Sequence, residues 1–197
     1  MGTNWYALTE RGREQARITG KWLRAQYPSP RRIIRSYYQR TRETADLLYP
    51  DFPIREDERL AEASRGIWHV RTEDEIRREA PWEIDRKQFE GLYHYRPIGG
   101  ENWPDVEGRV RAFRQSLRCR YPGETVVAVT HGHLIMLWQK LVHGWTIEET
   151  VARYERHEFA RNAAVLLYHG ETRGEKHMLT HNPAEDYVVP WEGKIAA

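Results

Sequence analysis

The sequence predicts an α/β fold, a three-layer sandwich in which helices flank a mostly parallel central sheet. Segments with apolar side chains at helical spacing alternate with short β-branched runs along the chain. The run Thr125–Val129 is typical of a strand buried on both faces of a parallel sheet. The 197 residues have 40% hydrophobic content and no repeat or linker-like tract, so we expect 1–197 to form a single domain.

The N-terminal part is predicted to contain a helix, a strand and a second helix. The first helix covers Thr9–Gln26, where the Thr9 hydroxyl can cap the N-terminus and Pro28 lies just beyond the end. A short apolar strand is predicted over Arg32–Ser36, and a helix over Arg40–Leu48 follows it directly.

The middle of the chain is predicted to be helical and then irregular. Thr72 and Glu75 have the spacing of a capping box, which indicates a helix start. Helical turns are expected to continue over Trp82–Phe89. The segment Gly91–Trp103 is rich in Gly, Tyr and Pro and is predicted to be a long loop.

From Pro104 onward the periodicity is stronger. A helix is predicted there because four apolar residues recur at spacings of four, three and four, namely Val106, Val110, Phe113 and Leu117. The strand Thr125–Val129 comes next, followed by a helix over Leu134–Leu141.

The C-terminal part is predicted to hold one more helix and a hairpin. Thr146 with Glu149 repeats the capping-box pattern. Asn162–Tyr168 and Lys176–Thr180 are predicted to pair as a hairpin that turns at Gly170–Gly174.

Charge and composition limit the function classes. The formal net charge is +2 and no basic block occurs, which argues against nucleic-acid binding and against a membrane-surface tail. No apolar run approaches the roughly 18 residues of a membrane span, and no signal peptide is recognised, so we expect a cytoplasmic protein. Cys119 is the one cysteine, which excludes a disulfide framework and a cysteine metal cluster.

The basic residues are strongly biased toward arginine. Of the 31 Lys and Arg residues only five are Lys, at positions 21, 87, 140, 176 and 194. The planar guanidinium fork suits phosphate and carboxylate oxygens, so the chain is equipped to bind an anionic ligand. We nevertheless favour genomic base composition as the cause of the bias.

His131 stands where the predicted strand Thr125–Val129 runs into a helix. Ligands of α/β sheets bind at the carboxyl ends of strands, and helix N-termini such as the one at Gly132 attract anions. His131 is therefore a candidate phosphate contact, although a core histidine could also stand there. Neither of the other His-Gly pairs, at His143 and His169, lies between a predicted strand and a predicted helix.

Two further residues are candidates for the same site. Arg40 follows the predicted strand Arg32–Ser36 at the start of a helix, so it is expected at the same sheet edge as His131. Glu62 stands among apolar and aromatic neighbours, which can raise the pKa of a carboxyl enough for it to donate a proton near neutrality. A solvated helix arginine and an ordinary surface carboxylate are the simpler alternatives.

Taken in order, several motifs resemble the histidine phosphatase superfamily, the phosphoglycerate mutase-like proteins. They are Leu8-Thr9-Glu10-Arg11-Gly12, Ser36 through Arg40 to Thr44-Ala45, Leu60-Ala61-Glu62, Gly99-Gly100-Glu101 with Asp105-Val106 and Arg109, and Thr130-His131-Gly132. Gly66-Ile67-Trp68-His69 and Tyr93-His94-Tyr95-Arg96-Pro97 look closer to small phosphatase-like members than to glycolytic mutases.

The resemblance implies phosphoryl transfer through a phosphohistidine, without metal or cofactor. It makes Arg40 a phosphate clamp, His131 a second phosphate-binding imidazole, and Glu62 the acid that protonates the leaving group. It also implies a small phosphorylated substrate, or inorganic phosphate, as ligand. Weaker candidates for substrate contacts are Gly132, Asn162, His94, Arg96 and Glu101.

One family feature is absent from the sequence. Relatives carry the nucleophile in an Arg-His-Gly motif upstream of the Leu-Thr segment that here begins at Leu8, whereas all nine histidines of this chain lie at or beyond His69. We expect the missing strand to belong between the strands that end at Ser36 and Thr130. Residues 1–6 could replace it, its two neighbours could close the gap, or the natural chain begins earlier, which we favour.

Several functions stay open at this point. The natural protein is expected to be a phosphomonoester hydrolase, with this domain N-terminally incomplete and the chain as given inactive. The alternatives are a pseudophosphatase that binds anionic ligands or a protein partner, a phosphoglycerate mutase-type phosphotransferase, and an enzyme in which His133 or His94 replaces the nucleophile.

Overall fold

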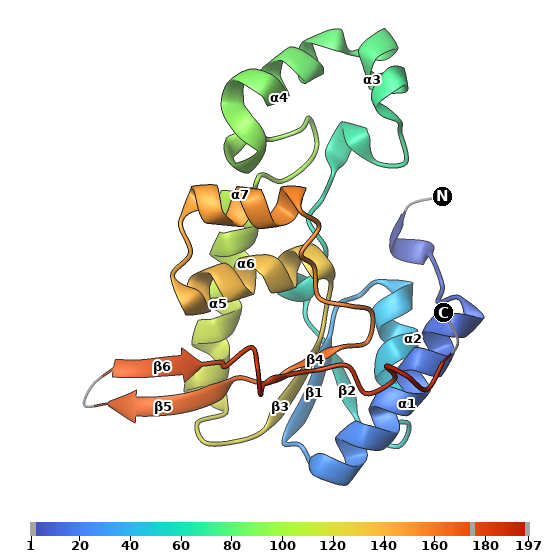
Figure 1. The fold of residues 1–197 in the computed structure, drawn as a ribbon, viewed down its shortest axis with the longest axis vertical. Helices are drawn as coiled ribbons and strands as arrows, with labels where there is room; N and C mark the ends of the chain where they lie inside the picture. Colours follow the sequence, from blue (N-terminus) through green and yellow to red (C-terminus); the bar gives the residue numbers. More distant parts are fainter. Residues whose placement is uncertain (1–2, 174–175, 196–197) are drawn as a thin grey trace.

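The structure is a computed structural model that describes residues 3–173 and 176–195. Its main sheet has three parallel strands in the order β2-β1-β3, formed by Ile54–Glu56, Arg32–Arg35 and Val126–Val129 (Figure 1). The predicted strands over 32–36 and 125–129 are confirmed, and each is one residue shorter than expected.

Helices cover both faces of this sheet, which confirms the predicted α/β architecture (Figure 1). Ile33 and Ile34 are adjacent in β1 and point to opposite faces. Ile33 packs with side chains of α1 and α2, whereas Ile34 packs with side chains of α5 and α6. The four helices are α1 (Glu10–Gln26), α2 (Gln39–Leu48), α5 (Trp103–Arg120) and α6 (Gly132–His143).

The pairing of β1 with β3 differs from the expected gap between them and agrees with the alternative in which these two strands pair directly. The two strands are direct neighbours, in register from Arg32 opposite Val126 to Arg35 opposite Val129. No strand position is therefore vacant between the strands that end at Ser36 and Thr130, because their backbone groups already pair with each other.

One unpaired edge of the main sheet is the outer edge of β3. The Val129 carbonyl accepts the Ser36 N–H at 3.1 Å, so Val129 faces β1 and its neighbour Ala128 faces away. By the same alternation Val126 also directs its N–H and C=O outward. Among residues 3–173 and 176–195 no strand pairs with this edge, and Ala128 is exposed although the strand is wholly apolar.

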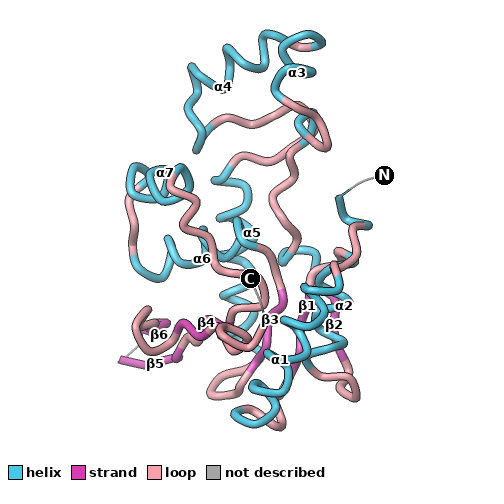
Figure 2. Tube along the Cα trace, turned by 45° about the vertical axis from the view of Figure 1, so that its right-hand side comes forward, coloured by secondary structure: helices cyan, strands magenta, loops and turns pink. Residues whose placement is uncertain are grey.

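A helical lobe stands above the carboxyl ends of the strands (Figure 2). It contains the 3-10 turn η3 (Gly66–Trp68) and the helices α3 (Glu73–Glu79) and α4 (Pro81–His94). The capping box predicted at Thr72 is present. The predicted loop Gly91–Trp103 is too long, because α4 continues to His94 through a kink at Gly91, where φ is 73°.

The remaining helical elements contact neighbouring helices. The capping box predicted at Thr146 starts α7 (Ile147–Glu155), which contacts both α4 and α6. Two more 3-10 turns, η1 (Thr3–Trp5) and η2 (Glu58–Leu60), contact α2 and α5 respectively. None of the helices in the described part of the chain is both long and apolar enough to cross a bilayer.

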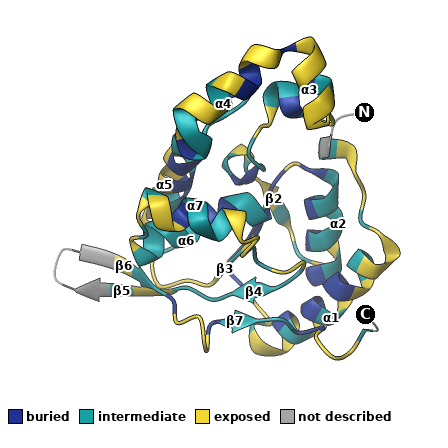
Figure 3. Cartoon of the chain, turned by 45° about the horizontal axis from the view of Figure 1, so that its top comes forward, coloured by how far each residue is buried: buried dark blue, intermediate teal, exposed yellow. Residues whose placement is uncertain are grey.

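The predicted C-terminal hairpin has the wrong partner strand. β6 (Lys176–Thr180) pairs with β5 (His169–Arg173), and the segment predicted as its partner instead contains β4 (Val165–Leu166), which pairs antiparallel with β7 (Tyr187–Val188). Figure 3 shows β4 and β7 at intermediate burial beside the main sheet. The end of the predicted turn, Gly174, lies outside the described residues.

Candidate functional site

Arg40 and His131 meet at the carboxyl edge of the main sheet. β1 leads into α2, which begins at Gln39 and carries Arg40 in its first turn, and β3 leads to His131 at the N-terminus of α6. An Arg40 guanidinium nitrogen lies 2.9 Å from Nδ1 of His131. Two residues that are 91 positions apart in sequence therefore share one pocket beside a helix N-terminus.

The surroundings of His131 fix its ring as a neutral imidazole. Arginine can only donate, so Nδ1 of His131 accepts from Arg40, and Nε2–H then donates to the Ser36 hydroxyl at 2.9 Å. Burial, reinforced by the positive charges of Arg40 and Arg109, lowers the pKa of His131 to about 3. The pocket thus holds its positive charge on Arg40 and not on the imidazole.

Tyr38 is a residue of this pocket that the sequence did not reveal. The Arg40 guanidinium lies 4.5 Å from the centre of the Tyr38 ring, and the same ring meets the His131 imidazole edge-on at 4.7 Å. Tyr38 is buried at the N-cap of α2. Its aromatic face orients the guanidinium, and the only available signal was its place two residues before Arg40.

Glu62 lies close enough to Arg40 for the two charges to interact. Its carboxylate accepts the backbone N–H of Ala63 at 3.1 Å and that of His133. Burial raises the pKa of Glu62, and this effect outweighs the opposing hydrogen bonds and the charge of Arg40. A carboxyl whose pKa is raised in this way can act as a general acid.

Arg109 holds the segment that carries Glu62. Its guanidinium donates to the carbonyl groups of Arg59 (2.9 Å) and Ala61 (2.7 Å) and pairs with both carboxylate oxygens of Glu101. Burial alone would raise the pKa of Glu101, but the hydrogen bonds from Arg109 and the Ser64 N–H keep it below its usual range. In the described structure Glu101 is engaged in fixing this loop.

A cavity of about 440 Å³ opens beside Glu62. Gly132, His133 and Glu101 also line it, together with the rings of Trp103 and other aromatic residues. Nε2 of His133 is buried without a hydrogen-bond partner among the described residues, and burial lowers the pKa of this imidazole to about 4. Through Glu62 and Gly132, the cavity thus adjoins the pocket of Arg40 and His131.

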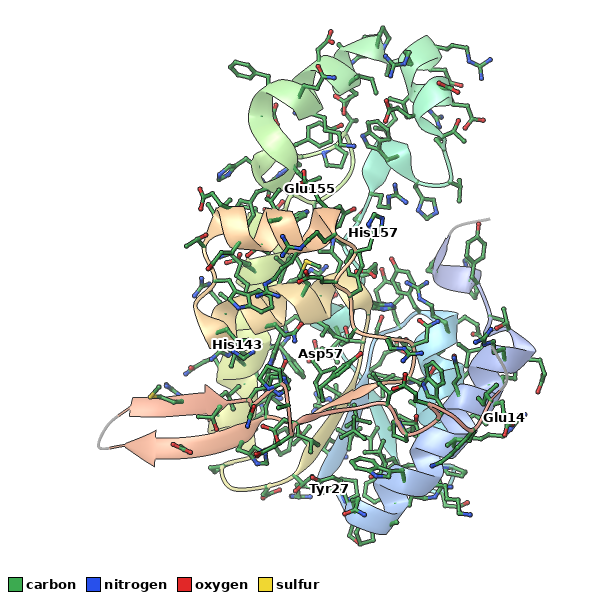
Figure 4. The ribbon with its side chains drawn as sticks, viewed as in Figure 1. Glu14, Tyr27, Asp57, His143, Glu155 and His157 are labelled. Carbon is green, nitrogen blue, oxygen red and sulfur yellow. The ribbon has the colours of Figure 1, made fainter. Side chains whose placement is uncertain are left out.

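Three predicted contacts lie elsewhere in this structure. His94 lines a separate groove between α4 and α7, together with Glu155, which is labelled in Figure 4. Arg96 is exposed and forms an ion pair with Asp105 at 2.5 Å. Asn162 is exposed, and its backbone carbonyl accepts from the Trp191 indole.

The position of His143 and the arrangement of possible metal ligands complete the description of the site. His143 is the last residue of α6, at the opposite end of that helix from His131 (Figure 4). In the part of the chain that the structure describes, no three His, Cys, Asp or Glu side chains are grouped to hold a metal ion. Chemistry without a metal stays a prediction.

Comparison with known proteins places this geometry in a family. Phosphoserine phosphatase 1 of Hydrogenobacter thermophilus is 27% identical over 129 residues, which cover 63% of this chain and 58% of that enzyme. Bacillus stearothermophilus YhfR superposes with a TM-score of 0.73 at 28% identity, over 92% of this chain and 86% of that one.

A mycobacterial glucosyl-3-phosphoglycerate phosphatase in complex with inorganic phosphate superposes with a TM-score of 0.72 at 26% identity, over 92% of this chain and 88% of that one. The family model of the histidine phosphatase superfamily (branch 1) matches residues 2–182. The chain belongs to the histidine phosphatase superfamily.

Proposed function

We propose that the natural protein is a phosphomonoester hydrolase that works through a phosphohistidine, with its nucleophilic histidine on a strand encoded before Met1. The observation that carries the proposal is the convergence of Arg40, His131 and Glu62 in one pocket. The phosphatases among the structural relatives support it, one of them in complex with inorganic phosphate.

In the proposed reaction, a nitrogen of the nucleophilic imidazole bonds to phosphorus as the bond to the leaving oxygen breaks. Arg40 binds the phosphoryl oxygens, and His131 joins it by redirecting its Nε2–H from the Ser36 hydroxyl to one of them. Glu62 gives its proton to the leaving oxygen, and the resulting carboxylate then takes a proton from the water that attacks phosphorus. The phosphorus–nitrogen bond breaks last, which releases phosphate and restores the imidazole.

The outer edge of β3 supports the position of the added strand. A strand parallel to β3 would pair with the outward-facing backbone groups of Val126 and Ala128 and would end beside His131. Its terminal residues would therefore enter the pocket of Arg40. This position lies on the other side of β3 from the one predicted from the sequence.

The test combines the gene and the enzyme. The codons upstream of Met1, read in frame, are expected to encode a short apolar strand that ends in Arg-His-Gly, and the extended protein is expected to hydrolyse p-nitrophenyl phosphate. Changing the histidine of that motif to alanine, or His131→Ala, should abolish turnover. An in-frame stop codon before any such motif would contradict the proposal.

A pseudophosphatase is the second candidate, because the sequence itself contains no Arg-His-Gly. It predicts phosphate binding to the 197-residue chain together with an upstream stop codon. A replacement nucleophile is a third candidate, since Nε2 of His133 is buried without a partner among the described residues beside Glu62. It predicts hydrolysis by the 197-residue chain that His133→Ala abolishes.

A further inference from the structure

We propose that His143, His181 and Tyr168 form a binding site for a divalent transition-metal ion such as Zn²⁺. The site is separate from the phosphate pocket, because His143 is the last residue of α6 and His131 lies at the other end of that helix (Figure 4). The three ligands come from the end of α6, from the residue before β5 and from the residue after β6. The inference does not depend on the proposed function.

Buried polar atoms without partners gather in this region. Nε2 of His143, Nε2 of His181 and the hydroxyl of Tyr168 are all buried, and none of them has a hydrogen-bond partner among the described residues. The His181 side chain is among the most deeply buried histidines, at 9% exposure. Buried polar atoms are nearly always paired in native proteins, so three of them on neighbouring rings indicate that a bound group is their partner.

The rings are close enough to one another to bind the same ion. The centres of the His143 and His181 rings lie 5.5 Å apart, and the Tyr168 ring stacks on His181 at 4.7 Å. With Zn–N distances of about 2.0–2.1 Å, two imidazoles on one tetrahedral ion have ring centres about 5 Å apart. Small rotations of the rings are therefore enough for both Nε2 atoms to bind one ion.

Both imidazoles are in the neutral form that a metal ion requires. The Nδ1–H of His181 donates to the Leu167 carbonyl at 2.7 Å, which leaves the lone pair on Nε2. Metal-binding histidines commonly have their second ring nitrogen fixed by such a hydrogen bond. Burial lowers the pKa of His143, and the charges of His181 and Arg153 act in the same direction.

The third ligand is a phenol oxygen and not a further imidazole, thiol or carboxylate. Burial raises the pKa of Tyr168, so its hydroxyl keeps its proton until a metal ion displaces it. The Trp138 ring lies 5.6 Å from the Tyr168 ring, and its buried N–H has no partner among the described residues. An indole N–H cannot bind a metal ion, but it can donate to a metal-bound phenolate or water.

The surrounding charges are compatible with a cation. His143 stands at the C-terminus of α6, where the helix dipole is negative. Hydrogen bonds, chiefly from the Asn182 N–H, keep the pKa of Asp186 below its usual range, and His181 is close enough for its charge to add to this effect. The guanidinium of Arg153 is paired with Glu158 at 2.8 Å.

Isothermal titration calorimetry of the metal-free 197-residue chain with ZnCl₂ tests the site. We expect one Zn²⁺ per chain. His143→Gln and His181→Gln should each weaken Zn²⁺ binding at least tenfold, because each removes an imidazole lone pair. Tyr168→Phe keeps the ring without its oxygen, so it should also weaken binding and should abolish the release of about one proton that accompanies it.

Two control variants and a measurement on the unchanged chain separate this site from other metal-binding side chains. His157→Gln and Cys119→Ser remove exposed side chains and should leave the Zn²⁺ affinity unchanged. In nuclear magnetic resonance spectra of the unchanged chain, the Nε2 signals of His143 and His181 should shift together as Zn²⁺ is added. Circular dichroism establishes that each variant is folded.

Three results would overturn the inference. They are absence of Zn²⁺ binding, unchanged Zn²⁺ affinity in a folded variant of any of the three ligands, and Nε2 shifts that are confined to other histidines. Each would mean that the buried polar atoms here do not bind a metal ion together. None of them bears on the proposed function, because phosphate binding is measured at the other end of α6.

Discussion

At the scale of single residues, Glu62 shows how burial prepares a carboxyl for proton donation. Glu62→Gln in the N-terminally extended protein should lower kcat for glycerol 3-phosphate by about 10²- to 10⁴-fold, as expected for loss of a general acid. For p-nitrophenyl phosphate the rate of the first step, measured as a burst of nitrophenolate, should fall much less, because nitrophenolate leaves without a proton. Equal losses in the first step for the two substrates would show that Glu62 does not act as the acid.

The pH dependence of the same reaction follows from the direction of the shift. Because burial raises the pKa of Glu62, its acid form persists above the usual range for glutamate, and kcat for the alkyl phosphate should fall as pH rises through that raised pKa. The stabilisation of the folded state by the protonated Glu62 carboxyl should also decrease as pH rises.

The lowered pKa of His133 predicts a second pH effect: the stability of the fold should decrease as pH falls. Its pKa falls to about 4 in the folded state, so between about pH 6.5 and 4 the unfolded chain binds a proton that the folded chain does not. As the pH is lowered through this interval, the free energy of unfolding should therefore fall by about 1.4 kcal/mol per pH unit because of this group. Urea unfolding of His133→Gln at a series of pH values should show a shallower acid slope than that of the unchanged chain.

At the scale of elements, the contact between α1 and α2 depends on Gly20. A Cβ at Gly20 would lie 2.6 Å from the Leu47 carbonyl oxygen and 2.9 Å from Leu48 Cα, both backbone atoms. Gly20→Ala should lower the free energy of unfolding by about 1–3 kcal/mol. Gly108→Ala is the matched control in α5, where nothing lies within 4 Å, and it should raise stability by about 0.5–1 kcal/mol.

The unpaired outer edge of β3 allows a prediction about the hydrogen exchange of individual backbone amides. The N–H groups of Val126 and Ala128 face away from β1, so their hydrogen exchange should be much faster than that of Val127 and Val129 in the 197-residue chain. In the extended protein all four should be protected. Equal protection in the shorter chain would mean that another segment already covers this edge.

The elements that were predicted correctly have strong local signals. Thr9, Thr72 and Thr146 all cap helices as expected, because capping depends on residues three or four positions apart. The pairing of Val165 with Val188 was missed, since two-residue strands carry no periodicity and their partners are set by the whole fold. The continuation of α4 past Gly91 was missed because glycine there forms a kink and not an end.

At the scale of the whole molecule, the fold brings residues from three separate segments into one pocket. Arg40 and His131 could be predicted because each follows a recognisable strand, and parallel strands end at one edge of a sheet. Tyr38 and Arg109 act through ring contacts and carbonyl groups that only the assembled structure defines. Local sequence pattern thus predicted Arg40 and His131, whereas the residues that position them could be identified only from the tertiary structure.

The helical lobe also reaches the neighbourhood of this pocket. It contributes Trp68 and Lys87 to the cavity that Glu62 and Gly132 line. Elements that are far apart in the sequence therefore line one cavity.

The central claim is that Arg40 and His131 form a phosphate-binding pocket, and calorimetric titration of the 197-residue chain with inorganic phosphate tests it most directly. We expect saturable binding to one site, weakened at least tenfold by Arg40→Ala and unchanged by Arg71→Ala on the lobe surface. Absence of binding, or equal affinity in the chain and in Arg40→Ala, would contradict the claim.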